Sequence, residues 1–197
     1  MKNLVFFVSL FACIINAFSA KVDTVFIQSK CMKESIPNLV ITPDNYSKQK
    51  EGYPVLYLLH GATNNYTEWT RYASSLSDYS DKYNFIVVCP DGGSTSWYFD
   101  NQIDPIMKYE TYISSELVNY IDANYWTIPN RSKRAIAGLN MGGHELEYWK
   151  VTFKYQFFFF NEFFTIIPKR TTNLRPLGLV FASINSILRL ENILKKS

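Results

Sequence analysis

Arg134–His144 reads RAIAGLNMGGH, and this stretch decides the fold of the chain. Its first half, RAIAGL, is a short apolar run that predicts a buried strand. The residues that follow predict a sharp turn into a helix. Gly138 and Gly142 flank Asn140, two positions away on either side, and a strand turning into a helix brings backbones too close there for a Cβ. The stretch therefore predicts a strand–turn–helix corner that presents Asn140 at the carboxyl edge of a sheet.

Two longer apolar runs precede this corner and predict further strands. Pro54–Leu59 and Phe85–Cys89 are continuously apolar, which is typical of strands buried on both faces of a sheet. The spacing of apolar residues predicts helices over Thr67–Lys82, with Thr67 as N-cap, and over Tyr109–Tyr125. The order strand, helix, strand, helix, strand predicts an α/β fold with a mainly parallel sheet and flanking helices.

The beginning of the sequence predicts strands of a different kind. Val22–Ser29 and Leu39–Thr42 alternate or run apolar like antiparallel strands, separated by the polar stretch around Lys33–Pro37. Cys31 and Cys89 both fall in strand-like contexts, so we expect two separate buried thiols. The Cys and His residues show no metal-ligand spacing, and we expect neither a metal site nor a cofactor.

The composition and the first residues of the chain indicate the class of protein and its cellular compartment. The chain has 197 residues, 47% of them hydrophobic, and a net charge of +3, which favours a globular protein over a disordered one or a dedicated nucleic-acid binder. Met1 and Lys2, the apolar run Leu4–Phe18 and the small residues ending at Ala20 predict a signal peptide over residues 1–20. We therefore expect export to the periplasm or outside the cell, with no stable membrane span in the mature chain.

The corner around Asn140 has the setting of the G-x-S-x-G nucleophile elbow, in which a catalytic serine follows a strand and precedes a helix. An earlier strand ends in Leu58–Ala62, LLHGA. In such folds the loop after this strand provides one N–H of the oxyanion hole, and the residue after the nucleophile provides the other. By position, these donors are Ala62 and Met141.

Three ordered motifs resemble the "Putative esterase" family of α/β-hydrolases. They are YPVLYLLHG at Tyr53–Gly61, VCPDGGSTSWY at Val88–Tyr98 and AIAGLNMGGH at Ala135–His144, and the resemblance covers roughly residues 22–144. That family includes tributyrin and feruloyl esterases, S-formylglutathione hydrolase and the antigen 85 mycolyltransferases.

The resemblance implies serine esterase chemistry through an acyl-enzyme, with a His base, an acidic residue that orients it and a two-amide oxyanion hole. The partner it implies is a small-molecule ester or an acylated sugar. It also places His60, Gly61, Ser96, Trp97 and Tyr98 at the substrate cleft.

This sequence departs from the family pattern at the residues that would carry out catalysis. Asn140 stands where the family has serine, and its amide cannot become an alkoxide-like nucleophile. Loss of a triad nucleophile typically costs about 10⁶ in kcat. No His follows His144 and no Asp follows Asp122. We expect structural roles for His60 and His144, and the remaining acidic residues after the elbow are Glu145, Glu147, Glu162 and Glu191.

The character of the sequence changes at Glu145. Residues 1–150 carry 13 Lys and Arg against 15 Asp and Glu, whereas residues 151–197 carry 7 against 2, together with 8 of the 15 Phe. We therefore divide the chain into a signal peptide (1–20), the N-terminal part of an α/β-hydrolase domain (21–144) and a divergent tail (145–197). A disrupted reading frame would explain the tail, and the hydrolase fold is then partial and incomplete on its C-terminal side.

Three interpretations remain for the function. The chain is a secreted carboxylic-ester hydrolase with impaired catalysis, a non-catalytic pseudoenzyme that binds an acyl or sugar ligand, or a non-functional gene remnant. Hydrolysis of short-chain esters separates the first from the others, and cooperative unfolding separates the second from the third.

Overall fold

The computed structural model describes residues 20–48, 51–143 and 158–159. Within these residues the strands form one sheet in the order β1-β2-β4-β3-β5-β6. The strands are Lys21–Gln28 (β1), Ser35–Thr42 (β2), Val55–Leu59 (β3), Ile86–Pro90 (β4), Arg134–Gly138 (β5) and Phe158–Phe159 (β6).

The sheet is mainly parallel, as the sequence predicts. β4, β3, β5 and β6 pair in parallel, while β1 pairs with β2, and β2 with β4, in antiparallel register. β6 lies within the predicted tail and pairs with Ala135 and Ile136 of β5. The predicted signal peptide up to residue 19 and the rest of the tail lie outside the described residues.

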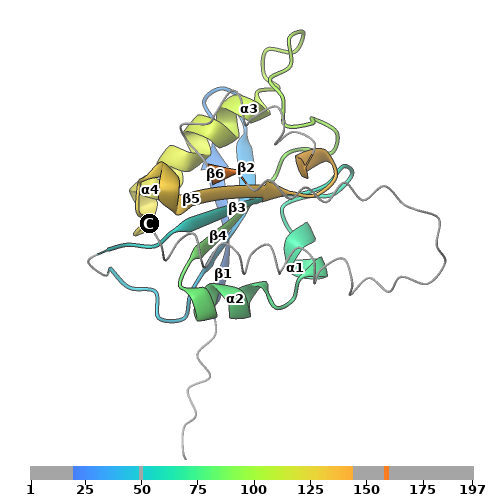
Figure 1. Cartoon of the computed structure of the whole chain (residues 1–197). Helices are drawn as coiled ribbons and strands as arrows, with labels where there is room; N and C mark the ends of the chain where they lie inside the picture. Colours follow the sequence, from blue (N-terminus) through green and yellow to red (C-terminus); the bar gives the residue numbers. More distant parts are fainter. Residues whose placement is uncertain (1–19, 49–50, 144–157, 160–197) are drawn as a thin grey trace, which may run out of the picture.

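Helices lie on both sides of the sheet (Figure 1). One side carries α1 (Glu68–Tyr72) and α2 (Leu76–Tyr83). The other side carries a continuous helical stretch made of α3 (Tyr109–Thr111), the π-helical turn η1 (Tyr112–Leu117) and α4 (Val118–Asn124). A short 3₁₀ turn, η2 (Arg131–Lys133), leads into β5.

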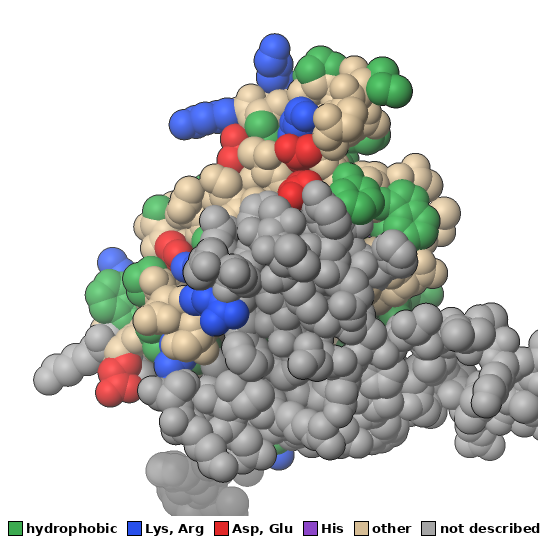
Figure 2. Space-filling view, turned by 45° about the horizontal axis from the view of Figure 1, so that its top comes forward, with side chains coloured by type: hydrophobic (Ala, Val, Ile, Leu, Met, Phe, Trp, Pro, Cys, Tyr) green, Lys and Arg blue, Asp and Glu red, His purple; other side chains and the backbone are tan. Residues whose placement is uncertain are grey.

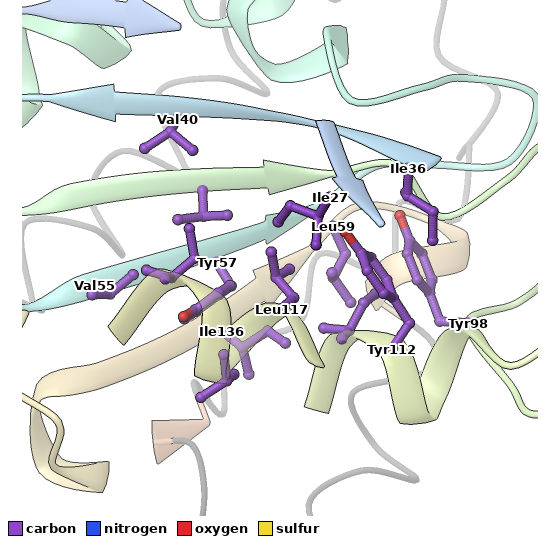
Figure 3. Packing of buried hydrophobic residues seen from close by; sticks show 14 of the residues in the cluster. Ile27, Ile36, Val40, Val55, Tyr57, Leu59, Tyr98, Tyr112, Leu117 and Ile136 are labelled. Atoms are coloured by element: carbon purple, nitrogen blue, oxygen red, sulfur yellow. The ribbon is translucent and has the colours of Figure 1, made fainter. Parts of the chain in front are cut away.

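The alternation of side chains along β3 divides the core between these two sides. Val55, Tyr57 and Leu59 pack in the cluster that contains Tyr112 and Leu117 of η1 (Figure 3). Leu56 and Leu58 point the other way, into the cluster that contains Leu76 of α2. Burial on both faces explains why this strand is continuously apolar.

Two predicted elements have different bounds in the structure. β2 begins at Ser35 rather than Leu39, because Ile36 pairs with Ile27 of β1 and is buried. The helix predicted over Thr67–Lys82 is two helices. α1 ends where the N–H of Ala73 bonds to the carbonyl of Trp69, and the two serines that follow are poor residues for a helix interior.

The predicted N-cap of the first helix is correct in position but not in its bond. Thr67 directly precedes α1, yet its side chain makes no capping hydrogen bond. Its hydroxyl donates instead to Asn65 Oδ1, at 2.7 Å.

Both described cysteines are free thiols, as expected, but the prediction that both are buried in strands is wrong for Cys31, which lies in the turn between β1 and β2. Cys89 is fully buried in β4, whereas Cys31 is partly exposed. Burial raises the pKa of both thiols. The helices of the described residues are all too short or too polar to span a membrane.

Candidate active site

The predicted corner after β5 is held by close backbone packing. The N–H of Leu139 donates to the carbonyl of Leu59 at 3.1 Å, and the N–H of Gly142 donates to the carbonyl of Leu139 at 3.0 Å. A Cβ on Gly138 would lie 2.4 Å from the backbone carbon of Gly142, and one on Gly142 would lie 2.5 Å from Leu59 Cβ. The corner therefore tolerates only glycine at these two positions.

Asn140 has a left-handed backbone at the tip of this corner, with φ of 50°. This is the strained conformation expected of an elbow residue, and Asn is among the few side chains that adopt it readily. The neighbouring Met141 is fully buried and begins a helical turn.

The turn after β3 faces the elbow. A Cβ on Gly61 would lie 3.4 Å from the Cβ of Asn140 and 3.5 Å from the carbonyl oxygen of Leu139. None of the turn and loop hydrogen bonds between described residues uses the N–H of Ala62 or of Met141. These are the two donors that the sequence assigns to an oxyanion hole.

Glu68 supports this turn and is not predicted from the sequence. Its side chain is only 3% exposed. Oε2 accepts the N–H of Gly61 at 2.5 Å, and Oε1 accepts the side-chain amide of Asn64 at 2.5 Å. An acidic residue in the first turn of a helix is usually solvated, so the sequence pattern does not indicate this buried position.

His60 is a structural residue in this arrangement. It is fully buried, and its Nε2 accepts the N–H of Gly92 at 2.8 Å. Nδ1 therefore carries the ring proton and lies 2.8 Å from the carbonyl oxygen of Gly61. With both nitrogens bonded, the ring ties the loop after β4 to the turn after β3 and is not free to act as a base. His144 and the later glutamates lie outside the described residues.

The loop after β4 places its three predicted cleft residues in different roles. The Ser96 hydroxyl donates to the carbonyl of Gly92 and accepts the N–H of Tyr98 at 2.9 Å. Tyr98 is fully buried and donates to the carbonyl of His60 at 3.1 Å. Trp97 is 43% exposed, and its N–H lies 3.3 Å from Met141 Sδ. Ser96 and Tyr98 therefore hold the loop in place, and the ring of Trp97 is the part of the loop that is exposed.

An open cavity of about 540 Å³ adjoins Trp97. Its apolar lining includes Phe99, Ile103 and Met107, and its charged lining is Asp100 and Glu110. Burial, and next the charge of Asp100, raise the pKa of Glu110 above its ordinary value. On the face shown in Figure 2, Lys and Arg side chains are interspersed with acidic and hydrophobic ones. The described residues contain no group of His, Cys, Asp and Glu that could hold a metal ion.

A mainly parallel sheet, with a glycine-flanked corner after one strand and a facing turn after its neighbour, is the arrangement of the α/β-hydrolase fold. Residues 29–145 match the model of the family described as "Putative esterase". The match spans more than half of the chain, and the chain belongs to this family.

Individual relatives agree with this membership. An esterase of Mycobacterium tuberculosis is 35% identical over 107 residues, which cover 53% of this chain and 23% of that protein. An acetyl esterase of Caldicellulosiruptor saccharolyticus is 28% identical over 123 residues, covering 59% of this chain and 45% of that protein. The solved structure of a ferulic acid esterase is 33% identical, with a TM-score of 0.62 over 71% of this chain and 56% of that one. The chain therefore spans less than half of these two curated relatives and just over half of this solved structure.

Proposed function

We propose that this protein binds a small carboxylic ester or an acylated sugar at the elbow and does not hydrolyse it. The observation that carries the proposal is Asn140 at the tip of an otherwise intact elbow, with φ of 50°. A side-chain amide has no proton that a base can remove at neutral pH to make a nucleophile. Acyl-enzyme formation therefore lacks its first step.

Ligand binding is supported by groups that do not depend on a serine. The N–H groups of Ala62 and Met141 are not used in turn or loop hydrogen bonds between described residues. The exposed ring of Trp97 and the adjoining cavity offer an apolar surface of the kind that small-molecule sites use. The likeness to a ferulic acid esterase favours an aromatic acyl group among the possible esters.

We also propose that the protein works outside the cytoplasm. The basic start, the apolar run Leu4–Phe18 and the small residues up to Ala20 support export to the periplasm or beyond the cell.

The catalytic half of the proposal is tested with p-nitrophenyl acetate and p-nitrophenyl butyrate. We expect the full chain to release p-nitrophenol no faster than buffer. Turnover by the native chain would contradict the proposal. An Asn140→Ser variant measured beside it locates the defect. Activity in that variant alone assigns the loss of hydrolysis to the side chain of Asn140. Inactivity in both proteins means that the catalytic His and the acidic residue implied by the family are missing as well.

The binding half is tested by calorimetry with methyl ferulate. We expect Trp97→Ala to weaken binding about tenfold, because its ring lines the cavity in which we place the acyl group. Trp126→Ala is the matched control, since Trp126 is similarly exposed, at 39%, and bonds through its carbonyl to Tyr53 before β3, away from the elbow. Equal losses in the two variants, or no binding by the native chain, would contradict the proposed site.

A further inference from the structure

We propose that Glu68 makes this site select an uncharged ester over the carboxylate anion of the same acid. This inference rests on the proposed binding of an ester at the elbow. It assigns to a buried carboxylate behind the oxyanion turn the role of a specificity-determining residue.

The carboxylate of Glu68 lies directly behind the turn that faces Asn140. Its Oε2 accepts the N–H of Gly61 at 2.5 Å. A Cβ on Gly61 would lie 3.6 Å from this oxygen and 3.4 Å from Asn140 Cβ. A single glycine therefore separates the carboxylate from the elbow side chain.

No ion pair among the described residues neutralises Glu68. Its second oxygen accepts the amide of Asn64 at 2.5 Å, and Asn64 Oδ1 in turn accepts from Arg71 at 2.9 Å. Arg71 is exposed and reaches the carboxylate only through this amide. Because Arg71 is in solvent and does not contact the carboxylate directly, it screens the buried charge of Glu68 only weakly.

The cavity beside Trp97 has acidic side chains in its lining, and Lys108 lies next to it, with Nζ 3.1 Å from the carbonyl oxygen of Asn101. The charged residues that line it are Asp100 and Glu110, and no Lys or Arg is among its described lining residues. At the elbow itself, a ligand carboxylate meets the negative charge of Glu68 from behind the oxyanion turn.

An ester and its acid differ in how they respond to this field. The carbonyl of an ester accepts hydrogen bonds from Ala62 and Met141 as a dipole, without a net charge. A carboxylate gains more from the same donors but is repelled by the buried charge of Glu68 behind Gly61. At an effective dielectric of about 20, repulsion between unit charges a few ångströms apart is worth about tenfold or more in affinity.

The test compares methyl ferulate with ferulate at pH 7.5, by calorimetry on the full chain and its variants. We expect the native chain to bind the ester at least about tenfold more tightly than the anion. Glu68→Gln retains an oxygen for Gly61 and removes the charge, and we expect it to tighten ferulate binding about tenfold with little change for the ester. Asp78→Asn, at an exposed acid of α2, is the matched control and leaves the ratio unchanged.

The ratio of the two affinities separates charge from structural support. If Glu68→Gln weakens both ligands equally, Glu68 only holds the turn and the proposal is overturned. Native binding of ferulate as tight as that of the ester overturns it as well, whether or not the Glu68 variant folds. Arg71→Gln is a second test. Loss of this exposed cation is expected to increase the preference for the ester over the anion about twofold. Binding of neither ligand by the native chain overturns both this inference and the proposed function.

Discussion

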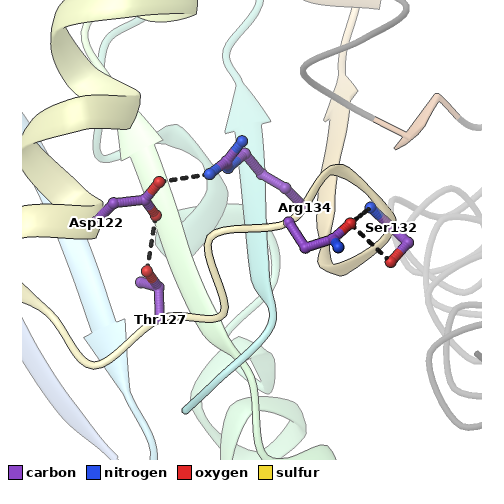
Figure 4. A network of polar contacts seen from close by, with 5 residues as sticks. Asp122, Thr127, Ser132 and Arg134 are labelled. Carbon is purple, nitrogen blue, oxygen red and sulfur yellow. Dashed lines mark hydrogen bonds and ion pairs between the residues drawn. The ribbon is translucent and has the colours of Figure 1, made fainter. Parts of the chain in front are cut away.

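The two ends of strand β5 are fixed by opposite means. At its first residue, the buried guanidinium of Arg134 pairs with Asp122 of α4, and Asp122 accepts the hydroxyl of Thr127 at 2.7 Å (Figure 4). At its carboxyl end, the corner is fixed by close packing at two glycines, with Gly138 against the backbone of Gly142 and Gly142 against the side chain and backbone of Leu59. An ion pair holds the first end, and close packing at two glycines holds the second.

This difference separates stability from function. Asp122 and Arg134 are directed at each other, so the first end contributes to holding α4 against the sheet. At the second end, the N–H groups of Ala62 and Met141 are not used in turn or loop bonds between described residues. The carboxyl end of β5 is therefore the end that lies beside the donors of the proposed site.

The largest effect is expected from adding one methyl group at the carboxyl end. In Gly138→Ala, the new Cβ would lie 2.4 Å from the backbone carbon of Gly142, and backbone cannot give way as a flexible side chain can. We expect a loss of about 3 kcal/mol or more in the free energy of unfolding, measured by urea denaturation.

Gly61→Ala is the matched control for this prediction. Its Cβ would meet only Asn140 Cβ, at 3.4 Å, and atoms farther away, so a loss below about 1 kcal/mol is expected. Equal losses at Gly61 and Gly138 would show that the corner is not fixed by backbone contact.

The first end should respond to the loss of charge. Asp122→Asn leaves Arg134, whose side chain is 9% exposed, without its carboxylate, and we expect a loss of about 2 kcal/mol in thermal or urea unfolding. Asp23→Asn is the control. It removes the same charge from an exposed pair, in which the Asp23 side chain is 46% and the Lys21 side chain 73% exposed, and should change stability by less than about 0.5 kcal/mol. A similar small change in both variants would contradict the role of charge at this end.

The strands and the corner could be predicted because they depend on local sequence. A strand buried on both faces is continuously apolar, and a tight corner needs glycine, so both leave a pattern that can be read. The break between α1 and α2 leaves no such pattern, because the spacing of apolar residues continues on both sides of Ala73 and the two serines after it.

The support of the site could not be predicted, because it is made by residues far apart in the sequence. Glu68 is buried because Gly61, at the end of another element, presents an N–H to it. His60 bonds Gly92, 32 positions away. Trp97 and Tyr98 both have left-handed backbones, with φ of 54° and 57°, although neither is a residue type that indicates one.

The smallest effect is expected at Glu110 of α3, which lines the cavity beside Trp97, and its sign should be opposite to that at Asp122. Burial and the charge of Asp100 raise the pKa of Glu110, so the folded state holds this proton more tightly than the unfolded chain does. Ionisation of Glu110 at neutral pH therefore lowers the stability of the fold, and this loss begins as the pH rises past the ordinary range of Glu.

Glu110→Gln should raise the free energy of unfolding at pH 7. The gain should be only a few tenths of a kcal/mol, because Glu110 is partly exposed and its charge is screened. The gain should vanish below about pH 4, where Glu110 is protonated in both states. Urea titrations at pH 7 and pH 3.5 measure it, with the exposed Glu51→Gln as the control. A loss at pH 7 in Glu110→Gln would mean that this carboxylate is held by a favourable partner, and the contrast with Asp122 would not stand.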